Sequence, residues 1–251
     1  MKGLRDRFWF VLGTLFLLLI WELAARYFAS PLILPGPLPV FRRFLEIVPT
    51  ERFLRALGAS FLRVCLGVLL SAPLGVLAGI AAGLDRRADY FLRPLLGFIS
   101  ATPVMALILI IFLWFGSEGT PVFTAFLMVF PVMAANTTAG VRAVDGNLRE
   151  LCKVYRLSRA DTLRWLYIPG ILPFILGALR SSLSLAWKVI VAAEVLVQPL
   201  RALGTGMQRA KAQLETPELF AWTAATVIAA ALSQLLLSLV LRIGRRGRLH
   251  A

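Results

Sequence analysis

Cysteine and histidine are scarce in this sequence, and their scarcity excludes several kinds of site. The two cysteines lie in different surroundings, Cys65 inside an apolar run and Cys152 inside a basic polar run, so no disulfide framework is expected. The single histidine, His250, is near the C-terminus, and this set of residues predicts no metal site. The HExxH and GxSxG strings of metalloproteases and serine hydrolases are also absent. The sequence therefore predicts no catalytic centre.

A nucleotide-binding loop is missing as well. Such a loop needs the string G-x-x-x-x-G-K followed by serine or threonine, because the backbone cradles the phosphates and the hydroxyl holds magnesium. Glycine, valine or alanine follows each of the four lysines, which are Lys2, Lys153, Lys188 and Lys211. We therefore expect this chain to bind no cofactor, and we expect any ATP and Mg that drive it to be used by a partner chain.

Charged residues are few, and long apolar runs take their place. Of the 251 residues, 59% are hydrophobic and 16% are charged, a balance far from that of a soluble domain. The net charge of +14 would suit a nucleic-acid binder, but here lysine and arginine interrupt apolar runs instead of covering a solvated face. The composition predicts a multi-pass membrane protein, which contacts lipid and binds no nucleic acid.

About six stretches are long and apolar enough to cross a bilayer. A hydrocarbon core of about 30 Å needs about 20 mostly apolar residues in a helix. We expect an all-α membrane protein with spans at 8–28, 61–84, 95–115, 121–140, 170–197 and 219–241. Pro103 falls inside the third span and Pro131 inside the fourth, and a bundle of membrane helices tolerates both.

Lysine and arginine gather on one side of the predicted membrane. They are frequent before the first span, between the second and third, between the fourth and fifth, and after the sixth, which places both termini in the cytoplasm. We divide the chain into a first helix with an outer amphipathic segment at the membrane surface (1–57), a core of five transmembrane helices (58–245) and a basic cytoplasmic tail (246–251).

Small residues recur along the second predicted span. Gly67, Gly75 and Gly79 are spaced so that they lie on one stripe of a helix. Glycine stripes in membrane helices allow the backbone of a neighbouring helix to approach closely. The stripe therefore predicts a helix packed against this side of the span.

The segment 141–169, between the fourth and fifth spans, is long, basic and compatible with a helix. Its apolar residues recur every three or four positions, at Leu148, Leu151, Val154 or Tyr155, and Leu157. The pattern predicts a short amphipathic helix, capped by Asp145 or Asn147 and followed at Pro169 by a turn into the next span. Two uses stay open: a cytoplasmic partner pushes on this helix, or the segment only fixes topology and binds anionic lipid.

Four strings of the sequence occur in the order and at the intervals of a known family. They are SFLRVCLGVLLSAPLGVLAGI (60–80), ATPVMALILIIFLWFG (101–116), FPVMAANTTAGVRAVD (130–145) and LAWKVIVAAEVL (185–196). Through them the chain resembles the inner-membrane permeases of binding-protein-dependent ABC importers, in their nitrate, sulfonate and taurine branch. The resemblance implies a type I ABC importer permease fold with a cytoplasmic coupling helix.

The signature loop of that family reads Glu-Ala-Ala, three residues, Gly, nine residues, Ile, one residue, Leu-Pro. Here Glu150 stands at the glutamate, Arg156 at the glycine and Pro169 at the proline. The resemblance implies that this segment seats in a groove of an ATPase through Glu150, Leu151, Cys152, Tyr155, Arg156, Leu157 and Ser158. Glycine adopts positive φ at low cost and arginine does not, so Arg156 leaves the conformation of the turn open.

The resemblance also implies a set of partners. They are a second permease subunit, identical or closely related, two ATPase subunits on the cytoplasmic side and an outer solute-binding protein. The implied solute is a small organic molecule, such as an anion or a vitamin precursor. Two alternatives are a secondary transporter, for which the expected inverted repeat is not found, and a membrane scaffold that binds lipid headgroups.

Ionisable and polar residues lie inside the predicted spans, where burial in lipid would be costly. The fifth span contains Arg180, Lys188 and Glu194, and the fourth contains Asn136 and Thr137. Arg180 and Glu194 lie about 40° apart around a helix and about 21 Å apart along it, so they share a face without touching. Two interpretations stay open: these residues line a translocation pathway that holds an anion, or they form salt bridges and hydrogen bonds between helices.

Overall fold

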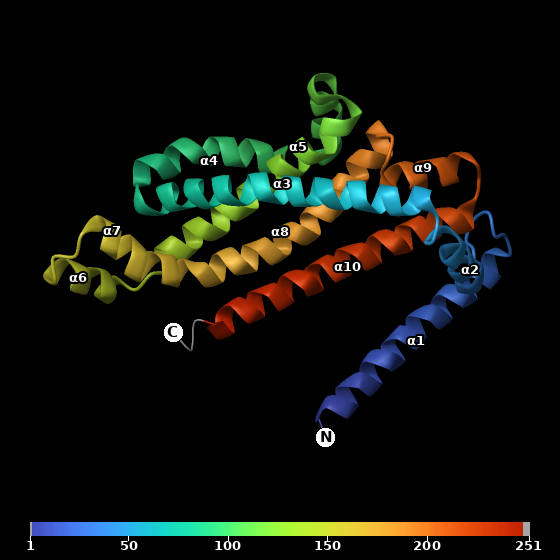
Figure 1. Cartoon of the computed structure of the whole chain (residues 1–251), viewed down its shortest axis with the longest axis horizontal. Helices are drawn as coiled ribbons and strands as arrows, with labels where there is room; N and C mark the ends of the chain where they lie inside the picture. The colour runs from blue at the N-terminus through green and yellow to red at the C-terminus, as the bar shows by residue number, and fades with distance from the viewer. Residues whose placement is uncertain (1, 248–251) are drawn as a thin grey trace.

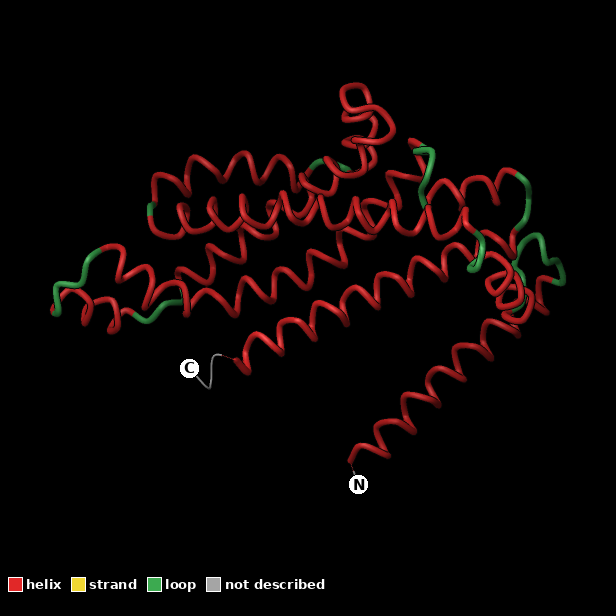
Figure 2. Tube along the Cα trace, in the orientation of Figure 1, coloured by secondary structure: helices red, strands yellow, loops and turns green. Residues whose placement is uncertain are grey.

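The chain is all-helical in the part that the structure, a computed structural model, describes: the backbone of residues 2–247 and the side chains of residues 7–242 apart from Arg159 (Figure 2). The helices are α1 (Lys2–Phe28), α2 (Pro37–Ile47), α3 (Glu51–Leu84), α4 (Arg86–Ala101), α5 (Val104–Arg142), α6 (Gly146–Val154), α7 (Arg159–Thr162), the π-helix η1 (Leu163–Tyr167), α8 (Ile168–Val197), α9 (Leu203–Ala212) and α10 (Thr216–Gly247). The predicted tail 246–251 lies largely outside the described residues.

Within residues 2–247, five helical stretches are long and apolar enough to cross a membrane. They are Arg7–Phe28, Glu51–Leu84, Val104–Arg142, Ala160–Val197 and Thr216–Arg242. Five of the predicted spans fall within these stretches, one in each. The predicted third span, 95–115, does not, because it is divided between α4 and the start of α5.

The break between α4 and α5 lies at Thr102, which has extended backbone angles (φ −73°, ψ 129°). A residue before proline disfavours the helical conformation, because the proline ring crowds its backbone. Pro103 therefore precedes the first turn of α5. The sequence had predicted that it lies inside a span. A second interruption, at Gly116, has φ 60° and ψ −171° and separates the two halves of α5. Thr102 therefore interrupts the predicted third span, whereas Gly116 lies just after its predicted end.

The core of the bundle is formed by α3, α5 and α8, and glycines of α3 bring α5 close. A Cβ atom added to Gly75 would lie 2.5 Å from Cβ of Met133, and one added to Gly79 would lie 2.5 Å from Cβ of Thr137. A Cβ atom added to Gly67 would lie 2.9 Å from Cβ of Ala125. The prediction of a closely packed helix on this stripe is confirmed.

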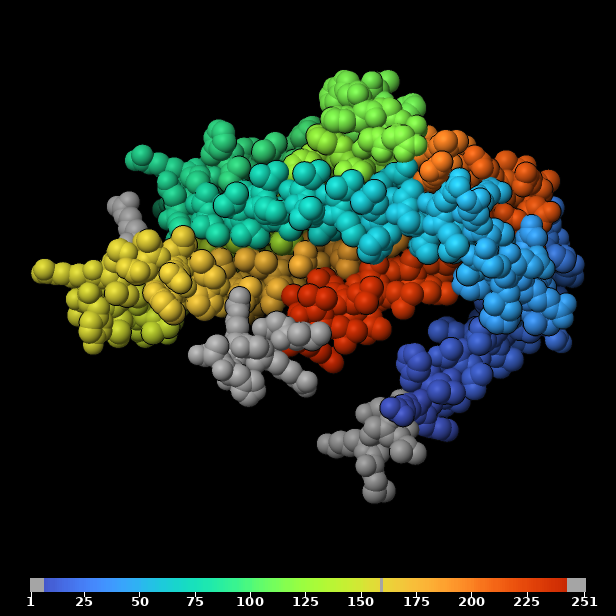
Figure 3. Space-filling model, in the orientation of Figure 1, coloured from blue at the N-terminus to red at the C-terminus, as the bar shows by residue number. Residues whose placement is uncertain are grey.

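The two ends of the bundle carry different short helices (Figure 1). The hairpin of α6 and α7 extends beyond one end of the bundle (Figure 3), while α2 and α9 lie at the opposite end, where both pack against α10. At the α2 end, Arg43 bonds to Glu218 of α10 at 2.6 Å. Helix α1 lies apart from the bundle, and no residue of its apolar window is buried.

Candidate functional site

The short helix predicted after α5 is present as α6. The carboxylate of Asp145 accepts a hydrogen bond from the N–H of Asn147 at 2.9 Å, so Asp145 is the capping residue. The apolar side chains of the predicted pattern lie on the surface, with exposed fractions of 54% for Leu151 and 72% for Tyr155. Exposed apolar side chains grouped on one short helix are typical of a surface that another protein covers.

Helix α6 ends in a turn at the position of the family glycine. Arg156 has φ 50°, in the left-handed region. The N–H of Arg156 donates to the carbonyl of Lys153, and the N–H of Leu157 donates to the carbonyl of Cys152, both at 3.0 Å. This pair of bonds is the Schellman motif, in which glycine is the usual left-handed residue. The turn conformation that the sequence left open is therefore that of the glycine, held by an arginine at a cost of about 1–2 kcal/mol.

The chain continues by helix from α7 through η1 into α8. The hydroxyl of Ser158 accepts a hydrogen bond from the N–H of Asp161 at 3.1 Å and starts α7. The prediction that Pro169 makes a turn here is wrong. A proline ring collides with the carbonyl four residues earlier in a regular α-helix, and the wider π-helix directly before Pro169 accommodates it. The hairpin is thus joined to a membrane-spanning helix without a flexible linker.

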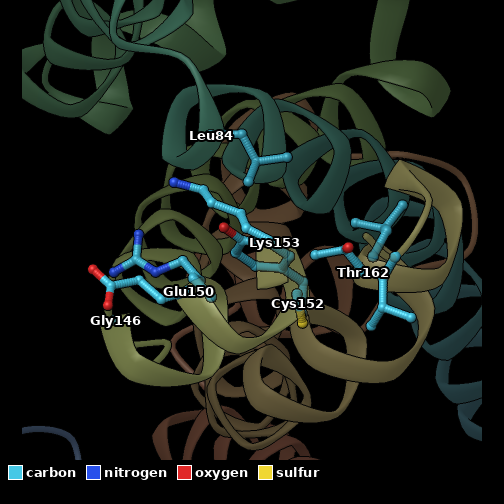
Figure 4. A pocket seen from close by; sticks show the side chains of 10 residues that line it. Leu84, Gly146, Glu150, Cys152, Lys153 and Thr162 are labelled. Carbon is cyan, nitrogen blue, oxygen red and sulfur yellow. The ribbon is translucent and has the colours of Figure 1, made fainter. Parts of the chain in front are cut away.

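A hollow of about 720 Å³ lies on the inner side of this hairpin (Figure 4). Leu84 at the end of α3, Glu150 and Cys152 of α6, and Thr162 of α7 line it. Three of the predicted coupling residues, Glu150, Cys152 and Leu157, therefore line the space between α6 and the long helices. Leu151 and Tyr155 are on the exposed surface. The hairpin thus has an exposed apolar surface on its outer side and a hollow on its inner side.

An ion-pair cluster ties the start of this segment to α4. Asp89 Oδ2 lies 2.9 Å from Arg142, the last residue of α5, and 2.7 Å from Arg93. The hydrogen bond from Arg142, supported by that from Arg93, lowers the pKa of the Asp89 carboxyl. Asp89 is therefore ionised at neutral pH, and the cluster holds α4 beside the point where the coupling segment begins.

Glu194 is fully buried in the bundle and bonded from two helices. Both of its carboxylate oxygens lie 2.8 Å from the hydroxyl of Ser60, and Oε1 lies 2.9 Å from Arg63. Arg63 also donates to the carboxylate of Glu118 at 2.5 Å and to the carbonyl of Arg201 at 2.9 Å. One charge network therefore connects α3, α5, α8 and the loop before α9.

Of the two interpretations left open for Glu194, the structure shows the salt bridge between helices and not an open pathway. Arg180, on the same helix, is exposed. The physical reason is α9, which covers this end of α8: the N–H of Gly204 donates to Glu194 at 3.2 Å. Arg63 was missed, although it is a cation inside the predicted span 61–84 and the rule that singled out Arg180 applies equally to it.

Arg180 and Lys188 lie together on an exposed side of α8. They line a shallow hollow of about 480 Å³ with Ser181, Ser184 and Gln234. Among the side chains that the structure describes, neither cation has an ion-pair partner. An unpaired cation facing hydrocarbon would cost several kcal/mol, so this side of α8 faces water or another protein.

Asn136 and Thr137 are adjacent on α5 but lie in different surroundings. Asn136 is half-buried beside a different hollow, and its amide donates to the carbonyl of Val132 at 2.8 Å. Thr137 is fully buried against Gly79, so its role is in helix packing rather than in an open pathway. Leu185 lines both the hollow of Asn136 and that of Lys188, and thus separates the two polar groups.

Comparisons with known proteins identify the family of this chain. Residues 71–247 match the family described as "Binding-protein-dependent transport system inner membrane component". The chain is 33% identical over 232 residues to the taurine transport system permease protein TauC of Escherichia coli (strain K12), which covers 89% of this chain and 84% of that protein. It is 30% identical over 208 residues to the bicarbonate transport system permease protein CmpB of Synechococcus elongatus, covering 76% of this chain and 73% of that protein.

The fold is similar to that of a chain in the crystal structure of a bacterial ABC transporter involved in the import of the acidic polysaccharide alginate. The TM-score is 0.64 at 16% sequence identity, over 98% of this chain and 99% of that chain. The predicted type I permease fold and family are therefore confirmed, and with them a multi-pass position in the inner membrane and the lack of an ATPase site in this subunit. A permease of this kind implies ATPase and binding-protein partners. The chain belongs to the family of inner-membrane permease components of binding-protein-dependent ABC transport systems.

Proposed function

We propose that this chain is driven by an ATPase that binds α6 and the turn after it (145–158) and that it conducts a small oxyanion across the membrane. The observation that supports the first part is the exposed apolar surface of α6, around Leu151 and Tyr155, on a helix that is fixed at both ends. Asp145 caps its start, and the Schellman turn at Arg156 fixes its end. When a partner covers an apolar surface of this kind, the removal of that surface from water favours binding.

The same hairpin can transmit motion to the membrane. A push on α6 passes through the hydrogen-bonded turn at Arg156 to α7, and from there by continuous helix through η1 into α8. A helix transmits displacement where a flexible loop would absorb it. Leu84 lines the hollow under the hairpin, so the end of α3 lies within reach of the same push. Binding and release of nucleotide in the partner would in this way tilt the two helices that carry Arg63 and Glu194.

We expect Leu151→Asp to weaken ATPase binding by roughly tenfold, because loss of one apolar anchor at an interface costs about 1.5 kcal/mol or more. Arg156→Gly should keep ATPase stimulation, since glycine adopts the left-handed turn without strain, while Arg156→Val should reduce it. Co-purification and solute-stimulated ATP hydrolysis in lipid nanodiscs measure both effects.

The matched control is Leu214→Asp, at an exposed leucine beyond α9 at the opposite end of the bundle. It should leave ATPase binding unchanged. Equal ATPase stimulation by Leu151→Asp and by the unaltered chain would contradict the proposed coupling surface, as would equal loss in Leu214→Asp.

The proposed solute class rests on Arg180 and Lys188, two exposed cations inside a membrane span. Two cations in one hollow attract a sulfonate, carboxylate or bicarbonate group, which accepts charge-assisted hydrogen bonds from both. The relatives' names, a taurine and a bicarbonate permease, agree with such a ligand. Because this side of α8 must face water or protein, we further propose that a second permease subunit encloses the pathway against it.

We expect Lys188→Met to raise the concentration needed for half-maximal transport by about tenfold or more, since a charged hydrogen bond contributes about 1.5–3 kcal/mol. Lys188→Arg should keep most of the function, because it retains the charge. Uptake of taurine, methanesulfonate, nitrate and bicarbonate into proteoliposomes that hold the complete complex measures the effect. Lys211→Met, at an exposed lysine of α9, is the control. Unchanged uptake in Lys188→Met would remove this residue from the pathway.

A further inference from the structure

A basic hollow lies at the hairpin end of the bundle, where the end of α3, the start of α4 and the end of α5 meet. It has a volume of about 420 Å³. Arg86 and Arg93 of α4 line it together with Arg142 of α5, and Asp89 is the one acidic side chain among its lining residues. Three arginines against one aspartate leave two positive charges in excess, and such a concentration of charge in a partly enclosed space creates a positive potential.

This hollow lies at the depth of the lipid headgroups on the cytoplasmic side. Two membrane-crossing stretches, Glu51–Leu84 and Val104–Arg142, both end at residues that line it. Along α4, Phe91, Leu95 and Phe98 are exposed and lie on one stripe of the helix, as expected for side chains that face hydrocarbon. Because lysine and arginine gather on the cytoplasmic side, the phosphates of the inner leaflet are the anions nearest to the hollow.

Close packing of α3 and α5 fixes Arg142 at the hollow. A Cβ atom added to Gly83 would lie 2.5 Å from Cβ of Val141, so the ends of the two helices are in direct contact. Arg142 donates to the carbonyl of Ala82 at 3.3 Å and lies 2.9 Å from Oδ2 of Asp89. Its guanidinium is therefore held from α3 and from α4, while about half of the side chain, 51%, stays exposed.

Tyr90 positions the other two arginines. Its ring centre lies 5.5 Å from the guanidinium carbon of Arg86 and 5.2 Å from that of Arg93. These cation–π contacts hold both guanidinium groups against one ring. The hydroxyl of Tyr90 accepts a hydrogen bond from Arg86 at 3.1 Å, so its own proton stays available to an acceptor in the hollow.

The donors of the hollow outnumber its acceptors. Arg93 and Arg142 share the carboxylate of Asp89, and among the side chains that the structure describes Arg86 has no ion pair at all. Each guanidinium presents five N–H donors in a fixed fork that matches the oxygens of a phosphate. A phosphate group would supply the missing acceptors and neutralise the excess charge.

We propose that this hollow binds the phosphate of an anionic phospholipid of the cytoplasmic leaflet, which joins the ends of α3, α4 and α5. A lipid is favoured over a free phosphate because two membrane-crossing stretches end here, which places lipid phosphates beside the hollow at high local concentration. Leu84 lines both this hollow and the one under the hairpin, so the lipid lies next to the segment proposed to bind an ATPase. The site is independent of the transported solute and of the proposed ATPase surface.

The test measures binding of fluorescent phosphatidylglycerol to the full-length permease in a non-ionic detergent, alone and with its ATPase. Binding should be saturable and much tighter than that of phosphatidylcholine, whose headgroup carries a compensating positive charge. Arg86→Gln should weaken phosphatidylglycerol binding about tenfold, because a charge-assisted hydrogen bond is lost. The matched control is Arg87→Gln, at the next residue, which is exposed and does not line the hollow. It should bind phosphatidylglycerol as the unaltered chain does.

Four outcomes would overturn the site. Equal binding of phosphatidylcholine, or equal loss in Arg86→Gln and Arg87→Gln, would show only a general attraction to charge. Displacement of the lipid by an equal concentration of inorganic phosphate would assign the hollow to a free anion, and loss of the lipid when the ATPase is added would assign it to an acidic surface of that partner. If Arg86→Gln does not fold, Tyr90→Phe decides, with about threefold weaker binding expected because the hydroxyl donor is lost.

Discussion

Replacement of Arg63 by methionine is expected to lower the free energy of unfolding by about 3–5 kcal/mol, because it leaves the carboxylate of Glu194 buried without its cation. Glu194 is 0% exposed and would keep only the hydroxyl of Ser60 and one backbone N–H as partners. Glu118 and the carbonyl of Arg201 would lose a donor in the same step. Equilibrium unfolding of the purified chain in detergent, followed by fluorescence of the buried tryptophans, measures this loss.

The control for this prediction lies on the same helix. Arg55 pairs with Glu51, but both side chains are more than half exposed, so Arg55→Met should cost less than about 1 kcal/mol. The double variant Arg63→Met/Glu194→Met should recover a large part of the loss, since apolar groups of similar size often replace a buried ion pair without penalty. A single Arg63→Met variant as stable as Arg55→Met would show that the network does not hold the bundle together.

Introduction of leucine at Gly79 is expected to destabilise the bundle by about 2–3 kcal/mol or more, because added atoms must push α3 and α5 apart. Even the first added carbon would lie 2.5 Å from Cβ of Thr137 and 2.6 Å from the carbonyl oxygen of Ala134. Gly79→Ala should therefore be destabilising as well. The unfolding experiment used for Arg63 measures both variants.

A second glycine of α3 separates packing from helix propensity. A Cβ atom at Gly58 would meet nothing within 4 Å. Gly58→Ala should therefore stabilise the helix by about 0.5–1 kcal/mol, the opposite sign to Gly79→Ala, since alanine has less backbone freedom to lose than glycine. If both alanine variants changed the free energy of unfolding in the same direction, close approach of α3 and α5 at Gly79 would not be what holds these two helices together.

Several elements follow from local sequence and were predicted from it. The apolar runs give the length of the long helices, the glycine stripe gives their close packing, and the spacing of Leu151 and its neighbours gives α6. The prediction of Asp145 as a possible cap was also confirmed, because a cap depends on residues two or three positions away. Features of this kind are encoded within a few turns of the chain and need no knowledge of the fold.

Other elements depend on partners that are distant in sequence, and the sequence did not reveal them. Glu194 meets Arg63 across 131 positions, so the pair exists only because α3 and α8 pack together. The predicted third span, 95–115, is interrupted at Thr102 and Pro103, where the backbone leaves the helical conformation although the composition stays apolar. The predicted turn at Pro169 failed because a π-helix relieves the proline without ending the helix.

The sequence by itself determined that this protein is an all-helical membrane permease with a basic segment placed for a cytoplasmic partner, because apolar run length, charge asymmetry and family strings are properties of the chain read in order. Only the tertiary structure decided which of the intramembrane charges are buried and which are exposed. Burial is set by the helices that cover a residue: α9 covers Glu194, whereas no described helix covers Arg180 and Lys188.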